Sequence, residues 1–242
     1  MQPPIFSECS HPLVKSLVHY SDQELVTLLQ RHPDSGQYFV ALFCRYSSIV
    51  FSLIRHSARS PVQAEYLFAV TWRHIFHELR GLDLRQITPS KQFPSKQLES
   101  PNVGSTSKSK SKSIQLQSWL INVTAACINQ APIPPVESIH YSLADASPPL
   151  WCYVEQAIDR LPPMQRLMVL MTQTFHWSDT RIAAHLQAEG DRISASEVKE
   201  QLRQGYQRLE AALPDDIRTI YFTQIEHTLN GASQNTSHEA DV

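Results

Sequence analysis

Leu161–Leu213 is the stretch from which the fold is most clearly predicted. It reads LPPMQRLMVLMTQTFHWSDTRIAAHLQAEGDRISASEVKEQLRQGYQRLEAAL and predicts three consecutive helices. Pro163 opens a first helix, where its missing N–H costs nothing, and Ser178 is a good N-cap for a second. Ser194 and Glu197, three residues apart, form a capping box that opens a third. The last two helices predict a helix-turn-helix, a unit that commonly places one helix in the major groove of DNA.

Apolar residues within these three helices recur at helical spacing, which indicates an inward and an outward face. The recurring residues are Leu167, Leu170, Met171, Ile182, Ala183, Leu186, Val198, Leu202 and Leu209. Lys199, Arg203 and Arg208 point outward from the third helix, and Gly190 stops the second. The alternative to DNA binding is a compact three-helix module that binds protein or nothing, because this geometry serves many uses.

The composition predicts an all-α fold with one large domain or two small ones. The chain has 242 residues, 42 % of them hydrophobic, and only 6 glycines. Val and Ile mostly recur at helical rather than alternating spacing. The net charge of −2 gives the whole chain no general attraction for nucleic acid. We therefore expect any DNA contact to be local or assisted by a partner.

The cysteines and histidines show no metal-ligand spacing. We expect Cys9, Cys44, Cys127 and Cys152 to be reduced, partly buried thiols. The sequence shows neither a signal peptide nor an apolar run of membrane-spanning length. These features together predict a soluble cytoplasmic protein with no metal, no cofactor and no membrane partner.

The chain is expected to form two small helical domains joined by a flexible linker. The first covers residues 15–130, with helices over residues 21–29, 38–54, 61–81 and 114–130. Ser21 or Asp22 is expected to cap the first of these helices. A proline-rich linker at 131–149 leads to the helix-turn-helix domain at 150–225. The polar tail at 230–242 is expected to be disordered.

Residues 86–113 interrupt the first domain with a sequence rich in Ser, Lys, Pro and Gln. They carry five lysines and one glutamate, and end in alternating Ser and Lys. Such a composition cannot bury enough apolar surface to fold alone. A solvated insertion is the simpler interpretation, and a basic tether that stays near nucleic acid is the alternative.

Three motifs follow one another in the C-terminal domain: Leu161-Pro162-Pro163, then WSDTRIA at Trp177–Ala183, then Val198-Lys199 with Leu202. In this order they resemble the promoter-reading domain of a bacterial RNA polymerase sigma factor. The resemblance is to the sigma-70 superfamily in its compact, extracytoplasmic-function-like layout of two helical domains.

The N-terminal domain resembles the same family at three places. Leu42–Tyr46 (LFCRY) is similar to the start of the conserved core domain. Gln63–Leu67 (QAEYL), followed by Trp72 and Phe76, resembles the helix that docks on the polymerase clamp. Gln117–Leu120 (QSWL) resembles the start of the helix that reads and melts the promoter. The resemblance covers about two-thirds of the chain.

This resemblance implies a dissociable polymerase subunit and not an enzyme. Its partners would be core RNA polymerase, through clamp and flap, and promoter DNA, with an anti-sigma factor as a further candidate. The clamp-binding residues would be Gln63, Glu65, Tyr66, Val70 and Arg73. The DNA-facing residues would be Ser196, Lys199, Glu200 and Arg203, with Arg181 and Arg208 as phosphate anchors. Arg203 could read guanine or hold phosphate.

Two other functions stay open. Ile121–Gln130 carries no charge where the family supplies basic residues, so a sigma-like adaptor that binds polymerase without melting DNA is one alternative. A free-standing helix-turn-helix regulator is weaker, because residues 145–222 hold eight Lys and Arg against eleven Asp and Glu. An enzyme is disfavoured: the sequence has no P-loop, dinucleotide fingerprint or nucleophile elbow.

Overall fold

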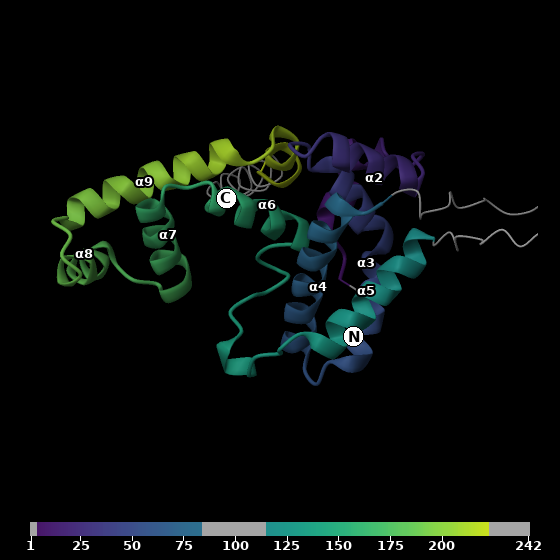
Figure 1. Cartoon of the computed structure of the whole chain (residues 1–242), viewed down its shortest axis with the longest axis horizontal. Coiled ribbons are helices and arrows are strands. Elements are labelled where there is room, and N and C mark those ends of the chain that lie inside the picture. The colour runs from purple at the N-terminus through teal and green to yellow at the C-terminus, as the bar shows by residue number, and fades with distance from the viewer. Residues whose placement is uncertain (1–3, 84–114, 223–242) are drawn as a thin grey trace, which may run out of the picture. The chain divides into compact units, whose positions relative to one another are not determined.

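The computed structural model describes residues 4–83 and 115–222 (Figure 1). All regular secondary structure in these residues is helical, which confirms the predicted all-α fold. Contacts divide the chain into two compact units, Met1–Pro149 and Leu150–Val242, which we call unit 1 and unit 2. The predicted insertion at 86–113 and the predicted tail at 230–242 lie outside the described residues.

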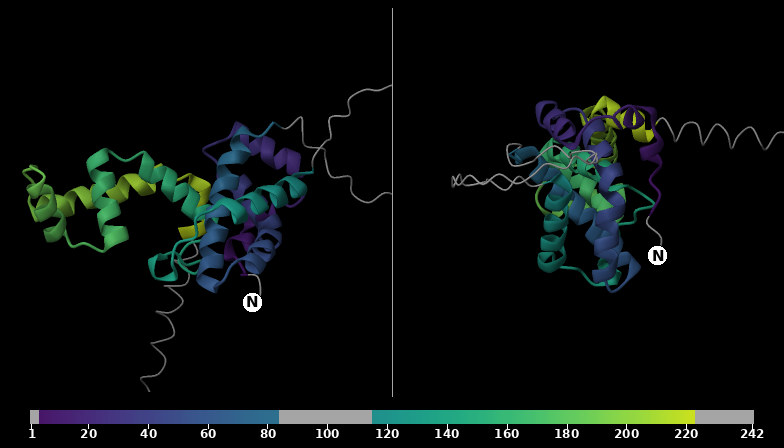
Figure 2. Two further views of the ribbon diagram at one scale, coloured as in Figure 1. Left: turned by 60° about the horizontal axis from the view of Figure 1, so that its bottom comes forward. Right: turned by 90° about the vertical axis from the view of Figure 1, so that its right-hand side faces the viewer.

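Unit 1 is a bundle of helices in which α3 and α4 are the longest (Figure 2). Its elements are η1 (Ser7–Ser10), α1 (Pro12–Lys15), α2 (Asp22–Arg31), α3 (Gln37–Ser57), α4 (Pro61–Gly81), α5 (Leu116–Gln130) and η3 (Val136–Ser138). α2 and α5 both pack against α3 and α4.

Local sequence signals set the helix starts of unit 1. Ser21 caps α2 as predicted: its hydroxyl accepts from the Glu24 N–H, and the Glu24 carboxylate accepts from the Ser21 N–H at 2.7 Å. Ser60 caps α4 in the same position, with Pro61 as the first helical residue. These partners satisfy backbone donors that the helix itself leaves unpaired.

The core of unit 1 is a cluster of aromatic rings between α3 and α4. Phe39, Phe43, Phe68 and Trp72 are fully buried, and their rings meet mostly edge-on or tilted. α3 is long and apolar enough to cross a membrane by length and composition alone, but 56 % of its apolar window is buried within the fold. It is packed as the core helix of a soluble protein is.

A buried polar cluster joins the start of α2 to α3. Arg45 donates to the Asp22 carboxylate at 2.5 Å, and the Tyr46 hydroxyl donates to its other oxygen. Arg45 also donates to the Tyr20 carbonyl at 2.9 Å. Burial, followed by the Asp22 carboxylate, raises the pKa of Tyr46.

The expectation that all four cysteines are reduced is wrong for two of them. Cys9 and Cys44 form a disulfide, with their Cα atoms 5.4 Å apart. The chain before α2 folds back along α3 and brings together residues 35 positions apart, which spacing in sequence does not reveal. Cys127 is half-buried and Cys152 is buried, and neither takes part in a disulfide.

Most of the predicted linker at 131–149, namely residues 131–147, packs on α4 of unit 1. The Gln63 side-chain amide donates to the Pro134 carbonyl at 3.2 Å. The Leu143 N–H donates to the Glu65 carboxylate at 3.1 Å. These bonds hold both ends of the segment, which we call the strap, against the first turns of α4.

In its described residues unit 2 contains four named helices, the first of which begins just before the unit boundary, and then a helix at residues 215–222. These are α6 (Pro148–Asp159), α7 (Pro163–Phe175), α8 (Asp179–Ala188) and α9 (Ala195–Ala212). The core that joins α7, α8 and α9 includes Met168, Val169, Ile182, Val198 and Leu202.

The inward face of α7 differs from the predicted one. Met171 is buried as expected, but Leu167 and Leu170 are each 41 % exposed. Met168 and Val169 are buried in their place. The run from Leu167 to Met171 is apolar throughout, so spacing alone could not select the register.

Candidate nucleic-acid interface

The helix-turn-helix is formed by α8 and α9, which pack directly on each other. Ser178 caps α8, its hydroxyl accepting from the Arg181 N–H at 3.3 Å. Ser194 and Glu197 form the predicted capping box at the start of α9, with 2.7 Å between the Ser194 nitrogen and the Glu197 carboxylate. Both helices therefore begin where the sequence predicts.

The turn between these helices is fixed by backbone bonds. Gly190 has a φ of 104°, a conformation that residues with a Cβ rarely adopt. The Asp191 N–H donates to the Leu186 carbonyl at 3.0 Å, and the Gly190 N–H donates to the Gln187 carbonyl at 3.1 Å. The Gln187 side chain spans the turn to the Ile193 carbonyl at 2.7 Å. The angle between α8 and α9 is thus built into the turn.

The four residues predicted to face the major groove are all exposed on α9. They are Ser196, Lys199, Glu200 and Arg203. Val198 and Leu202 on the opposite face are buried, so the helix presents this polar face outward without disturbing its core. The structure brings the predicted base-facing residues together on one surface.

Two of these residues form an ion pair on the exposed surface of α9. The Arg203 guanidinium donates to the Glu200 carboxylate at 2.8 Å and 2.6 Å, and Gln204 adds a bond at 2.8 Å. These bonds lower the pKa of Glu200 to about 2, so its carboxylate is charged at neutral pH. Arg203 must exchange this partner before it can pair with a base or a phosphate.

The two predicted phosphate anchors have internal partners. Arg181 lies with its guanidinium carbon 4.5 Å from the centre of the Trp177 ring. Arg208 donates to the buried Gln165 side chain at 2.6 Å, which joins α9 to α7. Both arginines are exposed, but the Arg208 guanidinium is held by the Gln165 side chain of α7 whereas Arg181 lies beside an aromatic ring.

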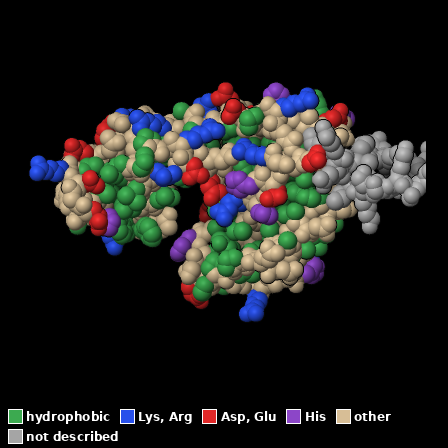
Figure 3. Space-filling view, viewed as in Figure 1, with side chains coloured by type: hydrophobic (Ala, Val, Ile, Leu, Met, Phe, Trp, Pro, Cys, Tyr) green, Lys and Arg blue, Asp and Glu red, His purple; other side chains and the backbone are tan. Residues whose placement is uncertain are grey.

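The charge on unit 2 is mixed. Figure 3 shows Lys and Arg interspersed with Asp and Glu over the face in view, while hydrophobic side chains gather over α7 and α8. Met164, Leu167, Leu170 and Phe175 of α7 are exposed, Phe175 by 62 %. Unit 2 therefore offers exposed apolar side chains, as well as charges of both signs, to a partner.

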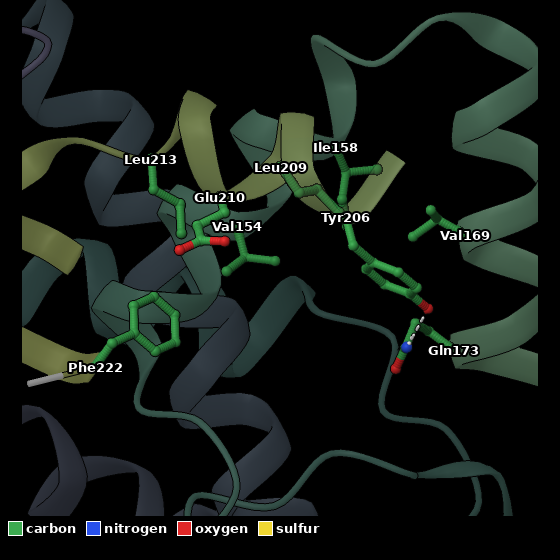
Figure 4. A pocket seen from close by; sticks show the side chains of 9 residues that line it. All are labelled: Val154, Ile158, Val169, Gln173, Tyr206, Leu209, Glu210, Leu213 and Phe222. Carbon is green, nitrogen blue, oxygen red and sulfur yellow. Dashed lines mark hydrogen bonds between the residues drawn. The ribbon is translucent and has the colours of Figure 1, made fainter. Parts of the chain in front are cut away.

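Sequence analysis missed a groove that unit 2 forms away from the polar face of α9 (Figure 4). Its volume is about 670 Å³. Its lining is mainly apolar and comes from Val154, Ile158, Val169, Gln173, Tyr206, Leu209, Glu210, Leu213 and Phe222. Gln173 donates to the Tyr206 hydroxyl at 2.7 Å. Since four helices contribute, no contiguous motif could have predicted the groove.

The predicted clamp-binding residues lie together on α4 and are half-buried. They are Gln63, Glu65, Tyr66, Val70 and Arg73. Gln63 and Glu65 bind the backbone of the strap, so these two side chains are already engaged within unit 1. A partner at this surface would meet the strap as well as α4.

The predicted promoter-melting helix, α5, exposes polar but uncharged side chains. Asn122 and Asn129 are exposed, and Thr124 is buried with its hydroxyl donating to the Leu120 carbonyl at 2.7 Å. Trp119, which leads this helix, is half-buried. The surface of α5 therefore offers one partly accessible ring and no positive charge.

Comparison with known proteins gives no relative of this chain. No protein-family model matches it, and no curated protein and no solved structure is significantly similar to it.

Proposed function

We propose that this protein is a sigma-like initiation factor of the cytoplasm that binds core RNA polymerase and directs it to a promoter. The observation that carries the proposal is the exposed polar face of α9, where Lys199 and Arg203 stand on a properly capped recognition helix. A helix of this kind reads bases from the major groove.

The charge of unit 2 supports a role that depends on polymerase. A domain with more acidic than basic residues gains little affinity from phosphate contacts, so it would need affinity from a partner. The apolar groove offers a surface for that partner, because buried apolar area drives most protein association. We assign the groove to the polymerase flap and the surface of α4 to the clamp.

The test is run-off transcription from genomic fragments with bacterial core polymerase and the full chain, together with a pull-down of core. Specific transcripts would support the proposal, and binding of DNA without polymerase would reject it in favour of a free-standing regulator. Arg203→Ala should weaken promoter use by about 1–3 kcal/mol if the side chain reads a base. Arg166→Ala on α7 removes the same charge away from the α9 face and should leave transcription unchanged.

The groove is tested separately from the α9 face. Ile158 lines the groove and is half-buried, so Ile158→Glu should reduce capture of core polymerase while the unit stays folded. Ala184→Glu is the matched control, because Ala184 is exposed on α8 and does not line the groove. Equal loss in both variants would reject the groove as the docking surface.

The uncharged surface of α5 favours one second candidate, an adaptor that binds polymerase but does not melt DNA. Strand separation needs a positive path for the displaced strand, which α5 lacks. Permanganate footprinting on a promoter complex distinguishes the two: reactive thymines indicate an initiation factor. Their absence, with polymerase bound, indicates the adaptor.

A further inference from the structure

The described residues before α2 form an arm on the surface of unit 1. The arm, residues 4–20, includes η1 and α1. Phe6 lies edge-on to Phe43 at 4.7 Å between ring centres, and Val14 and Leu17 are buried. Ile5, by contrast, is 98 % exposed. Few apolar side chains therefore hold the arm to α3 and α4.

The disulfide is the covalent attachment of this arm to α3. Cys9 and Cys44 are both only half-buried. Both line an open cavity of about 520 Å³ between the arm and α3, with Lys15 and Arg45 among the other lining residues. A disulfide that lines such a cavity can be reached by a thiol, unlike one sealed in a core.

We propose that Cys9–Cys44 is a site of reversible exchange with a dithiol reductant, and that its reduction releases the arm. One thiolate of the reductant attacks a sulfur of the disulfide, forms a mixed disulfide and displaces the other cysteine as a thiolate. The second thiolate of the reductant then displaces the remaining cysteine. Two electrons and two protons pass to Cys9 and Cys44, and the reductant leaves as a disulfide.

The charges around the cavity favour the exchange. Lys15 is exposed at the cavity, and a positive charge stabilises an attacking or departing thiolate. Arg45 is already paired with Asp22, so it contributes less. The free thiol of Cys127 differs, because burial raises its pKa and disfavours its reactive form.

Release of the arm would uncover part of the aromatic core. Phe43 and Phe68 are fully buried, and the Phe6 ring contacts both. After reduction only the non-covalent contacts of the arm remain, and segments held by few buried apolar side chains open easily. The exchange site thus couples a redox change to the exposure of an apolar surface. It depends on neither DNA nor polymerase.

The first experiment counts thiols in the full chain. Alkylation after denaturation should modify two of the four cysteines in the oxidised protein and all four after native treatment with dithiothreitol. Reduction of the native protein should be at most about tenfold slower than reduction in denaturant, because the cavity is open. Four free thiols without reductant, or reduction only in denaturant, would overturn the proposal.

The second experiment follows the arm by hydrogen exchange. Reduction should speed exchange of the amides of residues 11–20 and leave α4 protected. Cys9→Ser should reproduce this in the absence of reductant, whereas Cys127→Ser should not. An arm that stays protected after the thiols are free would overturn the release.

The third experiment couples the arm to the disulfide equilibrium. Phe6→Ala weakens docking of the arm and should shift the thiol–disulfide equilibrium toward the reduced form by about tenfold. Ile5→Ala is the matched control and should not shift it, since Ile5 makes little contact with the fold. Equal equilibria in the two variants would show that the disulfide is independent of arm docking.

Discussion

Unit 1 and unit 2 differ in the kind of core that they bury and in where their exposed apolar side chains lie. Unit 1 buries a cluster of aromatic rings and secures it with a disulfide and the polar cluster around Asp22. Unit 2 has an aliphatic core on three helices and leaves Leu167, Leu170 and Phe175 exposed beside an apolar groove. Surface that is left uncovered in this way is typical of a binding surface. Unit 1 also exposes apolar side chains, Ile5 and Val18 among them, so what distinguishes unit 2 is the apolar groove beside its exposed side chains.

The largest effect should come from Ile182→Asp, which tests how far the stability of unit 2 depends on its three-helix core. Ile182 is fully buried, and an unpaired carboxylate there should cost about 5 kcal/mol, enough to unfold unit 2. Thermal unfolding followed by circular dichroism should lose one transition and keep that of unit 1. Leu167→Asp changes an exposed position, so this variant should retain both transitions. Loss of the unit 2 transition in Leu167→Asp would contradict the described register of α7.

The next largest effect tests the polar cluster that secures unit 1. Asp22→Ala leaves Arg45 and the buried Tyr46 hydroxyl without their acceptor, which should destabilise unit 1 by about 3 kcal/mol. Urea unfolding measures this change in the free energy of unfolding. Asp22→Asn keeps an acceptor oxygen and should cost less.

The same cluster predicts a pH dependence on the alkaline side. Since the folded pKa of Tyr46 is raised, its stabilising contribution is complete below about pH 10 and is lost as pH rises further. Tyr46→Phe removes this titration, so its stability should fall less steeply than that of the native chain between neutral and strongly alkaline pH. Parallel pH profiles would show that Tyr46 titrates normally.

A smaller effect is expected from removing the serine N-cap of one helix in each unit. Ser21→Ala and Ser194→Ala each remove the acceptor at the start of a helix and should cost about 1 kcal/mol. Differential scanning calorimetry should show the larger fall in Tm in the unit with the smaller unfolding enthalpy, which we expect to be unit 2. The paired residues, Glu24 and Glu197, have lowered pKa values, so this stabilisation is lost as pH falls into the acid range.

The smallest effect is expected for Gly205→Ala in α9. A Cβ on Gly205 would lie 3.3 Å from the Val169 side chain, slightly closer than ordinary contact. Val169 also lines the groove and can move toward it, so the gain of about 1 kcal/mol in helix propensity should offset most of the crowding. Chemical denaturation should find the variant within about 1 kcal/mol of the native chain. A larger loss would indicate that unit 2 is packed as tightly as unit 1.

The sequence predicts those parts of the fold that depend on neighbouring residues. Ser21, Ser178 and Ser194 cap the helices that they were expected to cap, because a cap is decided within four residues of chain. The outward face of α9 also follows from spacing, since the apolar residues Val198 and Leu202 lie four positions apart with polar residues between them.

Features that need distant partners could not be predicted. The inward face of α7 depends on the helices that pack against it, and its apolar run allowed two registers. The Cys9–Cys44 disulfide and the strap on Gln63 each join segments far apart in sequence. Arg208 is an exposed charge as predicted, but its bond to Gln165, 43 residues away on α7, could not be predicted from spacing.

The exposed apolar residues of unit 2 also determine how its associations respond to salt. Added salt should weaken the proposed contact between Arg203 and DNA, because counterions compete for the phosphates. Sulfate strengthens burial of apolar surface, so it should tighten any contact made through the groove or through Leu167 and Leu170. The choice of salt therefore separates the two kinds of partner in one purified sample. It also means that concentrated sulfate favours self-association of this protein through α7.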